Sequence, residues 1–283
     1  MKCLKAVFLT LTIFTFVNAQ EGFRLVFPEL PSGSFDISGM IEPARQGQWP
    51  ATLVFASDEG EGCTSTIVGD GVLLTAAHCL DTVLEGQIFI GDDVLKVSCE
   101  RHPSYEAFAQ DQTTYPAYTA DFALCSTVDA EGNQVSINTF TRDEINFERV
   151  SDRIALVNLG TEVTLLGYGC VVPSINTNFT SLFLGRVIVT ELPKITSQGG
   201  VDLLTKTEGS AALCKGDSGG AAYMMVNGTR IIIGVNSLGD NVNSWIATTA
   251  THSFIDWARA WQEQRGLKIC GLDVDASPCR KSP

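Results

Sequence analysis

The sequence predicts an all-β fold, a barrel or a sandwich, with one helix near the C-terminus. Between residues 51 and 250, short runs rich in Val, Ile, Leu and Thr alternate with turn residues, and these runs lack helical periodicity. A convincing helical pattern occurs at residues 253–266. The chain has 283 residues, which is enough to bury a sizeable core.

The expected strands follow one another at regular intervals. Asp70-Gly71 and Asn227-Gly228 are dipeptides typical of tight hairpin turns, because these residues adopt positive φ readily. Each dipeptide divides one apolar run into two strands that we expect to pair. The strand-like runs are 51–57, 65–77, 86–99, 121–128, 161–169, 183–192, 219–238 and 244–250.

The expected helix has an apolar face and two capping residues. Phe254 and Trp257 recur at helical spacing, which predicts that this face packs on the outside of the core. Ser253 is the expected N-cap, and Gly266 is the expected C-cap.

The first residues are typical of an export signal. Lys2 and Lys5 precede an apolar run at 6–17, which is too short to span a bilayer. Small residues at 17–19 then provide a cleavage site, so we expect a signal peptide at 1–19. The protein is therefore expected to be secreted and extracellular.

The cysteine count agrees with an extracellular protein. Removal of the signal removes Cys3 and leaves eight of the nine cysteines. An even number in a secreted chain predicts four disulfides, although about a hundred pairings are formally possible. Two Asn-x-Ser/Thr triplets, at Asn178 and Asn227, are expected glycosylation sites.

The charge excludes some partner classes. The chain has 32 acidic and 19 basic residues, a net charge of −13, which repels phosphate backbones and anionic membranes. We expect no nucleic-acid partner, no membrane partner, no metal and no cofactor. The pair Asp92-Asp93 is interpreted as a solvated turn rather than a calcium ligand, and His102 and His252 as core or surface histidines.

Three short motifs contain catalytic residue types. His78 ends the motif TAAHC, Asp121 begins DFAL, and Ser218 lies in GDSGG. A glycine-rich segment around one serine is, by itself, as typical of a turn as of a nucleophile. A serine becomes a good nucleophile when an imidazole accepts its proton and an aspartate orients that imidazole.

In this order and at these spacings, the three motifs resemble the trypsin/chymotrypsin-like serine proteases over about residues 37 to 266. The resemblance implies two six-stranded antiparallel β-barrels with a C-terminal helix, and a serine endopeptidase that works through an acyl-enzyme. It implies that His78 is the general base, that Asp121 orients His78, and that Ser218 is the nucleophile. The N–H groups of Gly216 and Ser218 would form the oxyanion hole.

The resemblance also implies activation by cleavage of a precursor. In the family, a new N-terminus pairs with the aspartate before the serine, which is Asp217 here. The nearest match to that N-terminus is Ile37, so the chain is expected to divide into a propeptide at 20–36, a protease domain at 37–266 and a C-terminal tail at 267–283. No Lys or Arg lies between Arg24 and Arg45, so the activating protease is not expected to be trypsin-like.

The resemblance places Ala212 at the base of the primary specificity pocket and Ser237, Gly239 and Ile246 on its walls. A trypsin has an aspartate at that base, and without it a buried Lys or Arg side chain would have no counter-charge. We therefore expect cleavage after apolar P1 residues, closer to chymotrypsin or elastase than to trypsin. The expected partners are protein or peptide substrates and protein protease inhibitors, and a monomer is expected.

Four disulfides accompany this interpretation. The resemblance implies a Cys63–Cys79 bridge beside His78. The other expected bridges are Cys99–Cys125, Cys170–Cys214 and Cys270–Cys279.

Two other functions remain alternatives. A catalytically inactive homologue would act as a binding or regulatory module, although all three catalytic residue types are present here. GDSGG also fits the nucleophile elbow of an α/β-hydrolase. That fold needs the order Ser, acid, His, for which only Asp240 and His252 lie downstream, and it needs helices that the pattern lacks.

Overall fold

The computed structural model describes most of the chain beyond residue 40. The described residues are 41–44, 46–57, 62–80, 82, 84–105, 120–140, 146–153, 156–170, 181–192, 194–195, 201–206, 211–239, 243–272 and 279. Residues 37–283 group into one compact unit. The expected signal peptide and propeptide lie outside the described residues.

The first barrel consists of six strands in the described part of the chain. They are β2 (Thr52–Ser57), β3 (Gly62–Gly69), β4 (Val72–Thr75), β5 (Glu85–Ile90), β6 (Asp93–Arg101) and β7 (Ala123–Val128). They pair in the order β2-β3-β4-β7-β6-β5, and β5 pairs back to β2. In β6, buried Leu95, Val97 and Cys99 alternate with exposed residues, as expected for a strand with one face on the core.

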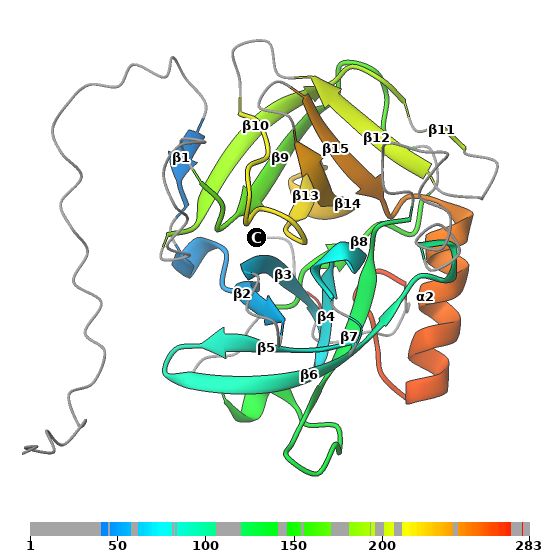
Figure 1. Cartoon of the computed structure of the whole chain (residues 1–283). Helices are drawn as coiled ribbons and strands as arrows, with labels where there is room; N and C mark the ends of the chain where they lie inside the picture. Colours follow the sequence, from blue (N-terminus) through cyan, green and yellow to red (C-terminus); the bar gives the residue numbers. More distant parts are fainter. Residues whose placement is uncertain are drawn as a thin grey trace, which may run out of the picture. The chain divides into compact units, whose positions relative to one another are not determined.

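The second sheet contains the remaining described strands. They are β1 (Ile41–Pro43), β8 (Arg149–Val150), β9 (Glu162–Gly167), β10 (Phe183–Val189), β11 (Lys194–Ile195), β12 (Val201–Lys206), β13 (Ala221–Val226), β14 (Thr229–Gly239) and β15 (Asn243–Thr248). The order β10-β9-β13-β14-β15-β12 returns to β10 through a short β10–β12 pairing. This ring of pairings fits the second barrel that the resemblance implies (Figure 1).

The two predicted hairpins are confirmed. Gly71 has φ of +71° between β3 and β4, and Asn227 and Gly228 have φ of +50° and +79° between β13 and β14. Positive φ at both central residues, as at Asn227-Gly228, is the geometry of a type I′ hairpin turn, whereas in the Asp70-Gly71 turn only Gly71 has positive φ. The dipeptides at these positions therefore determine where the strands reverse.

The C-terminal helix α2 spans His252–Arg265 and ends at Gly266, which adopts a left-handed φ of +63°. The predicted N-cap is wrong. Thr251, not Ser253, caps the helix, because its side chain accepts a hydrogen bond from the Phe254 N–H at 3.2 Å. Short 3-10 helices occur at η1 (Gln46–Gln48), η2 (Ala77–Cys79) and η3 (Ile137–Thr139). In the described residues, no helix is long and apolar enough to cross a membrane.

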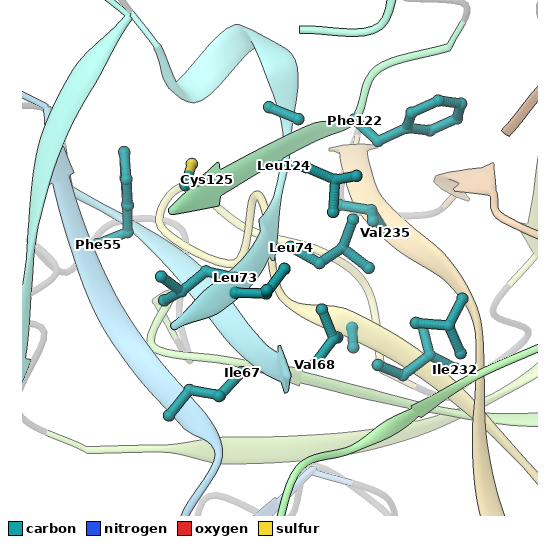
Figure 2. Close-up of a cluster of buried hydrophobic side chains, with 14 of the residues drawn as sticks. Phe55, Ile67, Val68, Leu73, Leu74, Phe122, Leu124, Cys125, Ile232 and Val235 are labelled. Atoms are coloured by element: carbon teal, nitrogen blue, oxygen red, sulfur yellow. The ribbon is translucent and has the colours of Figure 1, made fainter. Parts of the chain in front are cut away.

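The buried side chains form two clusters that share β14. The larger cluster fills the first barrel and extends to β14 and α2. Figure 2 shows Ile232 and Val235 of β14 beside Val68, Leu74 and Leu124 of the first barrel. The smaller cluster lies inside the second sheet and includes Val163, Leu165, Leu213, Ile233 and Ile246. Strand β14 therefore joins the two halves of the fold.

Candidate active site

His78 and Asp121 are brought together by neighbouring strands of the first barrel. Strand β4 leads into η2, which carries His78, and Asp121 lies just before β7, the partner of β4. His78 Nδ1 lies 2.6 Å from Asp121 Oδ2, and the His78 backbone N–H donates to Oδ1 at 2.9 Å. The aspartate is fully buried, whereas the His78 side chain is 22% exposed. The imidazole is thus fixed at one edge and reaches solvent at the other.

Ser237 provides a third hydrogen bond to the same carboxylate. Its hydroxyl donates to Asp121 Oδ2 at 2.6 Å from β14 of the second sheet. Burial by itself would raise the pKa of Asp121. The positive charge of a protonated His78 and the hydrogen bonds from His78 and Ser237 outweigh burial and hold that pKa below its ordinary value. Asp121 therefore remains ionised within the fold.

Ser218 lies in a tight turn that faces the His78 segment. Gly216 and Gly219 have φ of +99° and +84°, which side-chain-bearing residues rarely adopt. A Cβ on Gly219 would overlap Thr64 O and Thr75 Oγ1. Since Thr75 ends β4, just before the turn with His78, the glycine allows the Ser218 turn to approach the histidine.

No hydrogen bond between the Ser218 hydroxyl and His78 occurs among the described residues. Catalytic hydrogen bonds in enzymes without a bound substrate are often long or poorly aligned. The turn nevertheless provides two hydrogen-bond donors, the backbone N–H groups of Gly216 and Ser218. Within the same described ranges, no group accepts a hydrogen bond from the backbone N–H of Gly216 or Ser218.

Asp217 lines a small cavity. Its carboxylate accepts hydrogen bonds from the N–H groups of Gly169, at 2.8 Å, and Cys214, at 2.9 Å. The cavity measures about 30 Å³, and Leu166 and Phe183 belong to its apolar lining. Burial outweighs the two hydrogen bonds and raises the pKa of Asp217 to about 6. Ile37, its expected partner, lies outside the described residues.

The four expected specificity residues have different surroundings in the structure. Ala212 lines the cavity at Asp217 instead. Gly239 lies so close to Leu213 that an added Cβ would overlap the Leu213 carbonyl oxygen. Ile246 is fully buried in the cluster of the second sheet, and the Ser237 hydroxyl binds Asp121. Gly239 and Leu213 are therefore in close contact in this structure.

The structure forms four disulfides, the same pairs that were expected from the sequence. They are Cys63–Cys79, Cys99–Cys125, Cys170–Cys214 and Cys270–Cys279. Cys63, His78 and Cys79 are the metal-type cluster found among the described residues, but the two cysteines are bonded to each other and provide no thiolate ligand. Asn227 is exposed at a hairpin tip, whereas Asn178 lies outside the described residues.

Comparison with known proteins places this arrangement in a family. The model of the family described as Trypsin matches residues 39–258, which is well over half of the 283 residues. The chain belongs to the trypsin family. The resemblance to trypsin/chymotrypsin-like serine proteases is thereby confirmed at the level of the family.

A solved structure with the same fold agrees with membership of the trypsin family. Neuropsin, described as a serine protease expressed in the limbic system of mouse brain, has 18% sequence identity and a TM-score of 0.59. The match covers 78% of this chain and 98% of neuropsin. At this identity the likeness shows the shared fold. No curated protein matches the chain.

Two supporting residues of the site were not found from the sequence. Ser237 was expected in the pocket wall, and only the register of β14 places its hydroxyl on Asp121. Arg101 holds the turn that carries His78, because its Nε donates to Ala77 O at 3.1 Å and its terminal nitrogen donates to Leu80 O. An arginine on a strand gives no sequence signal of this role.

Proposed function

We propose that the chain is a secreted serine endopeptidase that hydrolyses peptide bonds through an acyl-enzyme. The observation that supports this most is the buried Asp121 carboxylate, which accepts hydrogen bonds from His78 and Ser237 beside the Ser218 turn. In this proposal His78 accepts the proton of Ser218 as the hydroxyl attacks the scissile carbonyl. His78 then donates that proton to the leaving amine.

The negative charge that develops on the substrate carbonyl oxygen needs donors. The N–H groups of Gly216 and Ser218, which have no acceptor among the described residues, are the proposed oxyanion hole. One donor of this kind is worth about 3 kcal/mol of transition-state stabilisation.

Activation is proposed to require cleavage before Ile37. The cavity at Asp217 has apolar walls and a carboxylate at one end, which suits an isoleucine with a free α-amino group. Ile41 pairs with Gly185, and Gly185 also lines that cavity. A new N-terminus four residues before Ile41 would therefore begin close to the cavity. Its positive charge would compensate the buried carboxylate.

The proposed P1 preference is apolar and small. Ala212 provides no negative charge, and Gly239 and Leu213 are in contact, which leaves little room for a large side chain unless activation separates them. The proposed partners are protein or peptide substrates and protein protease inhibitors. Glycosylation at Asn178 and Asn227 and a monomeric state complete the proposal.

A second candidate is a catalytically inactive homologue that acts as a binding or regulatory module. The contact between Leu213 and Gly239, a residue expected in the specificity pocket, favours it. The activity test below decides between the two.

The test uses secreted protein and its Ser218→Ala variant. N-terminal sequencing should read Ile37, a fluorophosphonate should label the wild-type protein but not the variant, and a peptide library should be cut after small apolar residues. Absence of labelling in protein that begins at Ile37 would favour the inactive homologue. Strong cleavage after Lys or Arg would contradict the proposed specificity, and a different N-terminus would contradict the activation site.

A further inference from the structure

Thr64 makes an unusual set of hydrogen bonds to the Ser218 turn. It is a fully buried residue of β3, adjacent to Cys63 of the disulfide beside His78. Its backbone N–H donates to Ser218 O at 2.7 Å. Its hydroxyl donates to Gly216 O at 2.8 Å and accepts from the Tyr168 N–H at 3.0 Å. One residue of the first barrel thus binds two carbonyl groups of the turn.

The orientation of these carbonyl groups determines the orientation of the turn. A trans peptide is planar, so its C=O and N–H point in opposite directions. The peptide after Gly216 is held at both ends, by Thr64 at the carbonyl and by Cys214 O at the Asp217 N–H. The carbonyl of Lys215, which precedes Gly216, accepts from the Cys170 N–H at 3.2 Å. Both peptides that flank Gly216 are therefore fixed.

Gly216 needs this external support more than other residues do. It has no side chain to restrict its rotation, and its φ of +99° is accessible because it is a glycine. The Thr64 hydroxyl is the described side-chain group that holds its carbonyl. Without that hydroxyl the Gly216–Asp217 peptide keeps only its hydrogen bond to Cys214 O. Rotation about the Gly216 backbone bonds would then change the direction of the Gly216 N–H, which belongs to the preceding peptide, relative to Ser218.

We propose that Thr64 is a positioning residue that keeps the Gly216 N–H directed at the developing oxyanion. The inference rests on the proposed peptidase function and adds a residue from the first barrel to the oxyanion hole. The residue acts through Gly216 and Ser218 and does not touch substrate. It should matter more in the transition state than in substrate binding, since the oxyanion forms only there.

The test compares Thr64→Val with Thr66→Val. Both threonines are fully buried in β3, but the Thr66 hydroxyl has no hydrogen-bond partner among the described residues. Thr64→Val removes two buried hydrogen bonds, to Gly216 O and from the Tyr168 N–H. Loss of the bond to Gly216 O should lower kcat about tenfold, with KM changed less than about twofold. Affinity for a peptide aldehyde, whose adduct with Ser218 carries an oxyanion, should fall by the same factor. Thr64→Ser, which keeps the hydroxyl, should recover most of the activity.

The controls separate this inference from the function on which it rests. Thr66→Val should keep wild-type kcat, and thermal unfolding of all variants shows whether each one is folded. Equal kcat for Thr64→Val and Thr66→Val would overturn the inference. A loss of Tm with kcat and aldehyde affinity unchanged would also overturn it, because the role would then be structural only. Failure of the wild-type protein to react with a fluorophosphonate would instead contradict the proposed function.

Discussion

Asp121 illustrates how single residues determine the chemistry of the site. Its Oδ2 atom binds both the His78 ring and the Ser237 hydroxyl, and its Oδ1 atom binds the His78 backbone N–H. Because Nδ1 of a neutral His78 must donate to the carboxylate, Nε2 is the ring atom that can accept a proton. One buried carboxylate therefore sets the tautomer that general-base catalysis requires.

Ser237→Ala tests the contribution of the third hydrogen bond to Asp121. We expect kcat to fall about tenfold with KM nearly unchanged, because a charge-assisted hydrogen bond that holds the carboxylate is lost. Steady-state kinetics on one peptide substrate measure the effect. Ser65→Ala is the control, since the buried Ser65 hydroxyl has no hydrogen-bond partner in the described ranges. Full kcat in Ser237→Ala would show that His78 alone orients the carboxylate.

At the scale of elements, His102 connects α2 to the segment that carries Asp121. Its backbone N–H donates to Phe122 O, and its ring lies 4.9 Å from the Phe122 ring and 5.0 Å from the Trp257 ring. The Ser104 N–H donates to Nδ1, so Nε2–H donates toward Ser253 O at 3.3 Å. The neutral ring thus binds two partners at once, one on each side.

His102→Gln tests this connection through the pH dependence of stability. Burial lowers the pKa of His102 despite the opposing hydrogen bond to Ser253. The folded protein therefore binds this proton less readily than the unfolded chain does, and stability is lost as pH falls below the ordinary value of about 6.5. We expect the wild-type protein to lose more free energy of unfolding than His102→Gln between about pH 6.5 and pH 5. Chemical denaturation at each pH measures it.

His252 provides the control for this experiment. It is an exposed histidine at the start of the same helix, and His252→Gln controls for the loss of a histidine from this region. If His102→Gln and the wild-type protein show equal slopes, the ring is not held neutral by the fold.

At the scale of the whole molecule, the buried Asp217 carboxylate makes stability depend on pH, and the proposed cleavage before Ile37 would change that dependence. In the uncleaved chain burial raises its pKa to about 6, from an ordinary value of 3.8. The folded state then binds the proton more readily than the unfolded state, so stability is highest at low pH and is lost as pH rises from about 4 to above 6. The shift corresponds to about 3 kcal/mol.

As the pH falls from 7 to 4, we expect the free energy of unfolding of the uncleaved Ser218→Ala protein to rise relative to that of the Ser218→Ala/Asp217→Asn protein. The difference between these two proteins isolates Asp217 from His102, whose contribution has the opposite sign in an overlapping range. Thermal unfolding across this pH range measures it. After cleavage before Ile37, a paired α-amino group would lower the pKa of Asp217, and the difference should reverse. If the two proteins show the same pH dependence of stability, the Asp217 carboxylate is not buried without a counter-charge.

A buried ion pair joins the second sheet to the segment before β8, and its arginine also contacts the η1 segment before β2. Arg230 of β14 binds Glu148 at 2.5 Å, and the two side chains are 14% and 1% exposed. The same guanidinium donates to Gln48 O and lies 3.7 Å from the centre of the Trp49 ring. Three distant segments of the chain therefore meet at one arginine.

Glu148→Gln should destabilise the protein by about 3 kcal/mol, because it leaves the Arg230 charge without its buried partner. Urea unfolding measures the loss. Glu100→Gln is the matched control. It breaks the Arg265–Glu100 pair, in which the side chains are 27% and 40% exposed, and should cost less than about 1 kcal/mol. Equal effects of the two variants would mean that burial does not strengthen the Arg230 pair.

Local sequence signals predicted the parts of the fold that depend on local chemistry. Asp70-Gly71 and Asn227-Gly228 marked real hairpins, and the apolar face of 253–266 marked α2. The motif order located His78 and Asp121, which meet in the structure. The closure of six strands into a barrel followed from the resemblance, since periodicity alone leaves barrels and sandwiches equally possible.

The remaining errors concern contacts between residues far apart in the sequence. The Ser237 hydroxyl reaches Asp121 across 116 positions, and Thr64 reaches Gly216 across 152. Residues this far apart in the sequence produce no local sequence pattern that would predict their contact. Ser253 was the expected N-cap, but the helix already begins at His252. The Ser253 hydroxyl lies beside the His102 ring instead. The pairing that places Leu213 against Gly239 is likewise determined by tertiary packing.

The pairing of β1 with β10 has a further consequence for the kinetics of activation. Ile37 lies four positions before Ile41, which β10 holds in register. An extended segment of that length reaches about 14 Å, so a new N-terminus would remain in a volume that corresponds to an effective concentration on the order of 0.1 M. A free isoleucine-containing dipeptide in solution would need a similar concentration to compete. After the proposed cleavage, insertion of the new N-terminus would therefore be independent of protein concentration and insensitive to dilution.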